Sequence, residues 1–214
     1  MVKSTALSPR ERRRAESEDR RRTELLDEAT LVFAEKGFHE TQMAEIAASA
    51  EFSKATLYTL FGSKEELYRE VVLRAIRRMR SEVQASVSAV DEPGERLLVL
   101  IDALFEVFEA NSEVVQLVLN GAQGLPWRVR QTMDQPSLRA IEGFQTWLIE
   151  LCEDAERAGA ISGLDARTFA IAMLGTFTNV ASDALKRAPH GSLKDQAQAV
   201  RELFSSSITR ARQQ

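Results

Sequence analysis

Apolar residues along this chain recur at the three- and four-residue spacing of amphipathic helices, and no segment alternates with the period of a strand. The pattern predicts a first helix over residues 20–36 and an unusually long one over residues 64–90. Later helices are expected between turn and capping residues, over 95–110, 113–121, 136–158, 165–187 and 192–210. We therefore predict an all-α fold.

Residues 41–67 carry the most specific pattern, two short helices joined by a tight turn and followed by a capped helix. Thr41 and Ser53 are candidate N-caps of the two short helices. Leu57 and Phe61 repeat at i and i+4, so they point inward. The outward side of the second short helix then carries donors suited to phosphates and base edges: Lys54, Thr56, Tyr58 and Thr59. Helices in this arrangement are a means of reading DNA.

Charge adds candidates on both sides of this segment. Ser63 and Glu66 form a capping-box pattern, which places Lys64 in a first helical turn beside the expected DNA surface. The net charge of −4 opposes association with DNA, yet residues 3–22 hold eight Lys and Arg against four Asp and Glu. Two interpretations stay open: a solvated, partly disordered tail, or an arm that follows phosphates or enters the minor groove. The arginines closest to the first helix, Arg22 among them, are the better phosphate contacts.

These residues together resemble the DNA-binding domain of the TetR family of transcriptional regulators. The resemblance rests on Ala34-Glu35-Lys36-Gly37-Phe38, on Ser53-Lys54-Ala55-Thr56-Leu57-Tyr58, and on Phe61 followed by Ser63-Lys64-Glu65. It implies a basic arm at residues 1–19, a three-helix helix-turn-helix domain at 20–67, and a helical ligand-binding and dimerisation domain at 68–212. It also implies these contacts with double-stranded DNA: Arg22, Thr41, Ser53, Lys54, Thr56, Tyr58, Thr59 and Lys64.

Two positions depart from the family pattern. Glu51 stands where the family usually has glycine in the turn, so we expect a left-handed backbone there at a cost of about 1 kcal/mol. Thr59 and Leu60 stand where relatives often carry histidine or an aromatic residue. Because Leu60 cannot form a hydrogen bond with a phosphate, one usual contact is missing.

Composition excludes several other classes of protein. The 214 residues, 44% of them hydrophobic, suffice for one or two domains, and no apolar run approaches the ~18 residues of a membrane span. The N-terminus lacks the apolar core of a secretory signal, so we expect a cytoplasmic protein without a membrane partner. The single cysteine, Cys152, is expected to be a packed core thiol. His39 and His190 lie far apart without a nucleophile at recognisable spacing, so no catalytic residue, metal or cofactor is expected.

The last two predicted helices carry apolar stripes with small residues that allow close approach between helices. In the TetR family this helix pair forms a four-helix bundle with its twin. The resemblance therefore implies a homodimer with these interface residues: Ala181, Ala184, Ala197, Val200, Phe204 and Ile208. The alternative, that both stripes are buried within their own subunit, is the weaker one because paired DNA half-sites require a two-fold dimer.

A ligand pocket is expected among the helices between residues 95 and 187. Its candidate lining residues are bulky and apolar, with one amide: Phe105, Phe108, Leu117, Asn120, Trp127, Phe144, Trp147, Leu148, Met173 and Phe177. Any one of them is more often ordinary core than pocket wall. Few charges fall on the inward helix faces, so the ligand should be mainly apolar, or amphipathic with its charge at the pocket mouth.

These expectations combine into one predicted function and one alternative. The predicted protein is a homodimeric repressor of the TetR type that a small apolar or amphipathic ligand releases from a palindromic DNA operator. The alternative is a DNA-bound interaction protein of the same fold that a protein partner regulates, without a small-molecule ligand. An enclosed cavity would favour the repressor, and a filled interior under an exposed apolar patch would favour the alternative.

Overall fold

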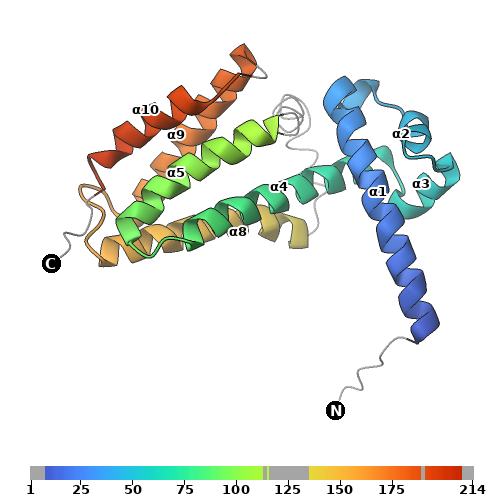
Figure 1. The fold of residues 1–214 in the computed structure, drawn as a ribbon, viewed down its shortest axis with the longest axis horizontal. Helices are drawn as coiled ribbons and strands as arrows, with labels where there is room; N and C mark the ends of the chain where they lie inside the picture. Colours follow the sequence, from blue (N-terminus) through green and yellow to red (C-terminus); the bar gives the residue numbers. More distant parts are fainter. Residues whose placement is uncertain (1–7, 113–114, 116–134, 189–190, 209–214) are drawn as a thin grey trace. The chain divides into compact units, whose positions relative to one another are not determined.

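The computed structural model describes residues 8–112, 115, 135–188 and 191–208 of the chain, with side chains described from residue 143 onward in the third range. Within these residues the regular structure is α-helical, as predicted, apart from one isolated β-bridge (Figure 1). The chain divides into two compact units, Met1–Val71 and Val72–Gln214. Helix α4 (Lys64–Ser88) begins in the first unit and continues into the second.

The first unit consists of α1 (Pro9–Glu40), α2 (Met43–Ser49), α3 (Lys54–Phe61) and the beginning of α4. Its core is small and apolar, and these side chains in it are fully buried: Leu25, Ala29, Phe33, Ile46, Leu57 and Leu67. The Tyr68 ring completes this core, because it packs edge-on against Phe33 at 5.1 Å and against Phe38 at 4.9 Å between ring centroids.

Helix α1 is longer than predicted. Residues 9–19, expected to be an arm before a helix at 20–36, continue the helix, so that expectation was wrong. Ser8 caps the helix reciprocally: its Oγ accepts from the Glu11 backbone N–H at 3.3 Å, and its own N–H donates to Glu11 Oε2 at 2.8 Å. Pro9 follows at the first helical position, where its missing N–H costs nothing. Near the other end the helical backbone is interrupted at Gly37, whose φ is +76°.

The turn chemistry of residues 41–66 agrees with the sequence in most places. Ser53 caps α3, accepting the Thr56 N–H at 3.1 Å, and Ser63 Oγ accepts the Glu66 N–H at 3.1 Å, both as predicted. Glu51 has the expected positive φ, +58°. The cap of α2, in contrast, is Gln42 rather than Thr41, because Gln42 shares a capping box with Glu45.

The second unit consists of the rest of α4 with α5 (Pro93–Ala110), α8 (Gln135–Arg157), α9 (Ala166–Arg187) and α10 (Lys194–Ser205). The first four end within two residues of their predicted bounds, and Asp165 caps α9 as expected. The helix predicted at 113–121 lies outside the described residues except for Val115. The last helix ends at Ser205 instead of continuing to 210, because Ile208 forms an antiparallel bridge with Ile161.

The core of the second unit is much larger and extends through all five helices. Phe105 and Phe177 meet edge-on at 5.0 Å, and Phe169 meets Phe204 at 5.4 Å between ring centroids. Cys152 is fully buried in this core, as predicted, and burial raises the pKa of its thiol to about 12. The thiol therefore stays protonated and unreactive in the folded protein.

Candidate nucleic-acid interface and ligand pocket

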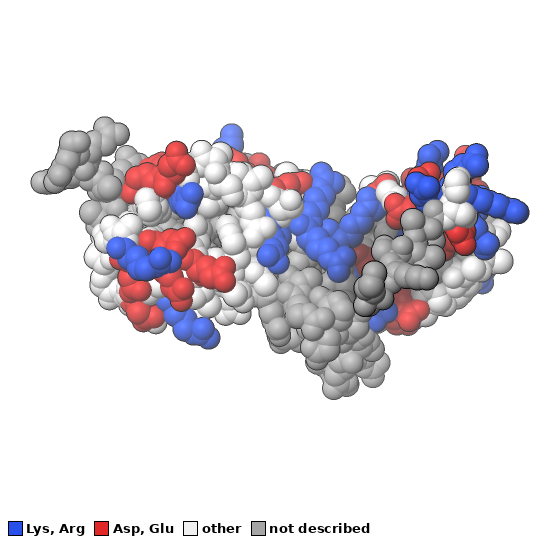
Figure 2. Space-filling model, turned by 90° about the horizontal axis from the view of Figure 1, so that it is seen from below, with Lys and Arg blue, Asp and Glu red and all other residues white. Residues whose placement is uncertain are grey.

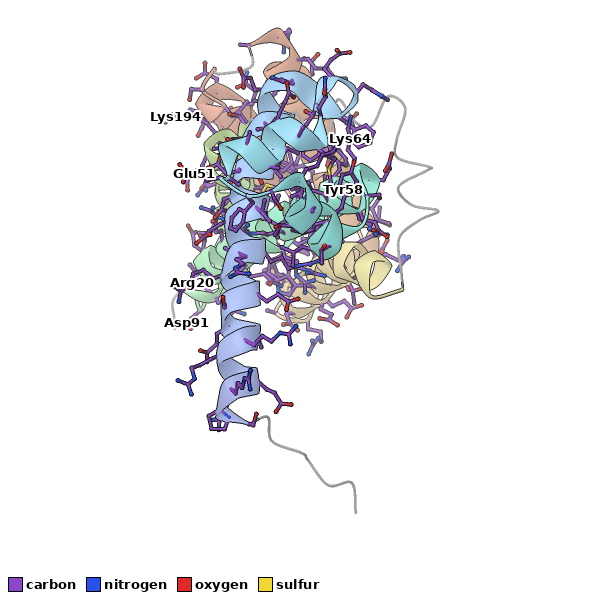
Figure 3. All side chains as sticks on the ribbon, turned by 90° about the vertical axis from the view of Figure 1, so that its right-hand side faces the viewer. Arg20, Glu51, Tyr58, Lys64, Asp91 and Lys194 are labelled. Atoms are coloured by element: carbon purple, nitrogen blue, oxygen red, sulfur yellow. The ribbon has the colours of Figure 1, made fainter. Side chains whose placement is uncertain are left out.

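The outward face of α3 presents the polar side chains that the sequence assigned to it. Lys54, Tyr58 and Thr59 are exposed and Thr56 is half-buried, whereas Leu57 and Phe61 point into the core. The label of Tyr58 marks this side of the short helix (Figure 3). Four polar side chains on two helical turns, held by an apolar underside, form a rigid surface suited to base edges and phosphates.

Local hydrogen bonds fix this surface before any partner binds. The hydroxyl groups of Ser53 and Thr56 lie 2.8 Å apart, and Thr59 Oγ1 donates to the Ala55 carbonyl oxygen at 2.8 Å. The Lys54 ammonium lies 5.8 Å from the centre of the Tyr58 ring. Each hydroxyl oxygen can still accept a hydrogen bond, and Lys54 can still donate to a partner.

Lys64 lies beside this surface but is held by α1. Its Nζ donates to the His39 carbonyl oxygen at 3.1 Å and lies 4.7 Å from the centre of the Phe38 ring. An ammonium group has three donors, so a phosphate can still bind the side chain in this position. The helix-capping Ser63 next to it fixes the backbone from which Lys64 projects.

Two residues of the predicted DNA-contact set have internal roles instead. The Arg22 guanidinium forms an ion pair with Glu70, donates to the Leu60 carbonyl oxygen at 2.8 Å and stacks 4.5 Å above the Phe61 ring. Thr41 is 1% exposed, and its hydroxyl donates to the Gly37 carbonyl oxygen at 2.7 Å. Thr41 is too buried to reach a phosphate, and Arg22 is engaged by Glu70 and the Leu60 carbonyl group, so we leave both out of the contact set proposed below.

An apolar pocket of about 370 Å³ opens between α4, α5, α8 and α9 of the second unit. Three of the predicted ligand-binding residues line it: Phe108, Phe144 and Phe177. Phe105, Leu148 and Met173 are buried core residues, and Trp147 packs beside Phe144 without lining this pocket. Leu117, Asn120 and Trp127 lie outside the described residues.

The α4 wall of the pocket was missed, because we expected the pocket only among the helices between residues 95 and 187. Ile76, Met79 and Val83 supply its apolar part, and Arg80 adds a guanidinium at the edge. Arg80 lies against α8 where Gly143 leaves room: a Cβ added to Gly143 would stand 2.7 Å from an Arg80 nitrogen. Figure 2 shows Lys and Arg side chains gathered in the middle of one face. No local signal marks Arg80, since its position depends on a helix 60 residues away.

The predicted dimer stripe lies inside its own subunit, which supports the alternative we had considered weaker. The buried members are Ala181, Ala184, Val200, Phe204 and Ile208, and Ala197 packs against the same core. The opposite face of each helix carries one exposed large apolar side chain. Leu203 is 61% exposed and Ile171 is 48% exposed, with Gly175 and Ala199 beside them along the helices.

Other kinds of site find no support in the part of the chain that the structure describes. There, no group of three His, Cys, Asp or Glu side chains is arranged to hold a metal ion. No described helix combines the length and the apolar character needed to cross a membrane.

Comparison with known proteins agrees with this geometry. Residues 25–71 match the family described as bacterial regulatory proteins, tetR family. The transcriptional activator FasR of Mycolicibacterium smegmatis is 36% identical over 100 residues, or 47% of this chain and 46% of FasR. The chain thus spans about half the length of that relative. The fatty acid metabolism regulator protein of Bacillus subtilis is 25% identical over 193 residues, 86% of this chain and 94% of that protein.

A solved structure extends the likeness to both units. The regulator FadR from Bacillus subtilis in complex with stearoyl-CoA matches 87% of this chain and 99% of its own, with a TM-score of 0.74 and 20% identity, and so shares the fold. Residues 25–71 therefore match the tetR family of bacterial regulatory proteins, and the helical arrangement of the chain matches the fold of a solved regulator.

Proposed function

We propose that the chain is a transcriptional repressor that binds a palindromic DNA operator as a homodimer and releases it when a small ligand occupies the second unit. The observation that carries the DNA part is the outward face of α3, where polar side chains stand on a capped helix over a buried apolar side. In the dimer, two such helices enter successive major grooves about 34 Å apart.

The side chains of the first unit divide into two groups by their positions. Lys54 and Thr56 in the first turn of α3 read base edges, with Ser53 and Thr59 beside them. Tyr58 and Lys64 bind phosphates, because Tyr58 projects from the middle of the helix and Lys64 stands outside it.

Single substitutions in the protein test this division. Binding is measured on a DNA duplex selected from a random-sequence library. Lys64→Ala should weaken binding to all sequences alike and lower the slope of log K against log salt concentration by about one. Thr56→Ala should relax preference at one base position and leave the slope unchanged. Sequence preference altered by Lys64→Ala, with an unchanged slope, would contradict the assignment.

The homodimer is proposed to form through the exposed face of α9 and α10 rather than through the buried stripe. Ile171 and Gly175 on α9 and Ala199 and Leu203 on α10 are each one helical turn apart, so each pair forms a short ridge. Large apolar side chains at this exposure are typical of a surface that a partner covers, and small neighbours allow close helix approach.

The ligand is proposed to have a long apolar part and an anionic end. The pocket is lined mainly by apolar side chains from four helices, and Arg80 is its charged group. A fatty acyl thioester has this chemistry, and the similar FadR structure contains stearoyl-CoA. The pocket is open, not the enclosed cavity that we expected of a repressor, but it leaves the interior of the second unit unfilled, unlike the protein-partner alternative.

Stearoyl-CoA is therefore the first probe for the pocket. Its affinity should be measured by titration with and without bound operator duplex; a coupling of ~1–3 kcal/mol makes it about 5- to 150-fold weaker on DNA. Arg80→Gln should weaken stearoyl-CoA binding, and Arg78→Gln is the matched control, because Arg78 lies on the same helix but pairs with Glu82 at 2.8 Å in solvent. Equal affinity with and without DNA would show that the pocket is not the switch.

A further inference from the structure

The part of the first unit that follows Arg22, which contains the predicted helix-turn-helix, is short of positive charge. Residues 23–71 contain four Lys and Arg residues against ten Asp and Glu residues. Three of the four basic side chains already have partners: Lys36 pairs with Glu45, Lys64 donates to the His39 carbonyl group, and Arg69 lies 3.6 Å from Glu66. Non-specific affinity for DNA comes from neutralising phosphates, so this domain needs positive charge from another part of the unit.

The N-terminal extension of α1 supplies that charge. It covers Pro9 to Arg21, all of whose side chains are exposed, and the Ser8–Glu11 capping box fixes its beginning. Thirteen helical residues span about 20 Å, roughly two-thirds of the length of residues 22–40, the remainder of α1. An exposed helix of this length is marginal by itself, so its amino-acid pattern must serve a purpose other than packing.

The arginines of this extension lie in one row. At 100° per residue, five of them fall within about 120° of one another around the helix axis. They are Arg10, Arg13, Arg14, Arg20 and Arg21. Arg12 falls on the opposite side, next to Glu16 and Asp19. Among the described residues none of these six arginines forms an ion pair, so the row is available to an external anion (Arg20 is labelled in Figure 3).

A groove joins the arginine row to the α3 surface. It has a volume of about 580 Å³, with Arg14 and Arg21 on one side and Thr56 and Thr59 on the other. Thr56 and Thr59 belong to the surface that faces DNA in the proposed function. A helix that occupies the major groove of DNA is bordered by the phosphates of the flanking strand. A DNA strand bordering α3 would therefore lie between the two walls of this protein groove.

We propose that the arginine row binds the phosphate strand bordering the major groove that α3 enters. The row extends the DNA contact beyond the base-reading helix and offsets the acidic core of the first unit. This inference rests on the proposed function, because it requires that α3 meets DNA. Glu18, which also lines the groove, opposes the contact, so its removal has the opposite effect.

The test measures binding of the full chain to a fluorescent duplex of mixed sequence over a range of salt concentrations. Arg14→Gln and Arg21→Gln should each weaken binding and lower the slope of log K against log salt concentration by about 0.9. Arg12→Gln is the matched control, since it removes the same charge from the opposite side of the same helix. Glu18→Gln should strengthen binding. Far-ultraviolet circular dichroism of each variant checks that the helix remains.

Four outcomes separate this inference from the proposed function. A slope that falls for Arg14→Gln and Arg21→Gln but not for Arg12→Gln supports the arginine row. A fall of equal size for Arg12→Gln shows a general charge effect and overturns the inference. A slope that no variant changes, although the unmodified chain binds DNA, overturns it as well. An unmodified chain that binds no duplex would instead refute the proposed function itself.

Discussion

Helix α3 and the α9–α10 pair each present one face to the core and one to solvent, and the sequence was interpreted correctly only for α3. On α3 the apolar residues lie in the core and the polar residues lie on the exposed face, as predicted. On α9 and α10 we took the apolar stripe itself for the partner surface, yet it is the subunit's own core. Apolar periodicity identifies the face of a helix that packs into the core of its own subunit. A surface for a second subunit appears as further apolar residues on the opposite, exposed face.

Substitutions at the adjacent residues Phe204 and Leu203 should distinguish the buried face of α10 from its exposed face with the largest effect. Phe204 is 7% exposed and packs on Phe169, so Phe204→Ala should lower the free energy of unfolding by about 3–5 kcal/mol. Leu203→Glu should leave the fold intact and shift the dimer towards monomer. Urea unfolding measures the first effect and sedimentation velocity the second. A Leu203→Glu protein that remains dimeric would exclude this face as the interface.

In the first unit, the adjacent residues Arg21 and Arg22 allow the same comparison between an exposed side chain and one with internal contacts. Arg22→Gln loses the ion pair with Glu70 and weakens the bond to the Leu60 carbonyl group, which should lower the free energy of unfolding by about 1–2 kcal/mol. Arg21→Gln removes an exposed charge and should change it by less than ~0.5 kcal/mol. Thermal unfolding of both variants decides the matter. Equal stabilities, with DNA affinity lost only in Arg22→Gln, would restore Arg22 to the contact set.

The turn between α2 and α3 offers a smaller effect. Glu51 has a φ of +58°, so Glu51→Gly should relieve up to about 1 kcal/mol of backbone strain. Part of the gain is offset by the greater freedom of glycine in the unfolded chain. The melting temperature should therefore rise slightly, and DNA binding should tighten as a negative charge leaves the surface. A lower melting temperature would mean that the carboxylate itself stabilises the turn.

The last comparison sets the two units against each other at alkaline pH. Burial raises the pKa of the Cys152 thiol from 9.0 and that of the Tyr68 phenol from 10.0, each to about 12. Because each folded pKa exceeds the unfolded one, the associated stability is fully present below the unfolded pKa and is lost as pH rises towards 12. The loss should begin about one pH unit lower for Cys152 than for Tyr68. Unfolding curves of Cys152→Ala and Tyr68→Phe at increasing pH measure each contribution.

The sequence predicted what depends on neighbours along the chain. The bounds of four helices, the caps at Ser53 and Asp165, and the positive φ at Glu51 all follow from residues within one turn of the feature. The start of α1 at Pro9 was also predictable, since Ser8, Pro9 and Glu11 form a complete capping signal. We overlooked it because residues 9–21 lack the apolar periodicity by which we located helices.

What the sequence could not predict depends on distant partners. Arg21 and Arg22 are alike in sequence, and only contacts 38 and 48 residues away give Arg22 its internal role. Arg80 lies at the pocket because Gly143 on another helix makes room for it. The DNA contacts and the ligand contacts that we named from the sequence stay predictions.

The pocket and the exposed face of α9 share a helix, and this has a consequence for how the protein responds to ligand dose. Along α9 the residues Ile171, Gly175, Thr178 and Ser182 follow one another at spacings of four, three and four, and the last two line the pocket. In the proposed dimer, filling one pocket therefore alters the surface on which the twin subunit packs. Ligand saturation should then be cooperative, with a Hill coefficient between one and two, the number of sites in the dimer, so that operators are released over a narrower range of ligand concentration than independent sites allow.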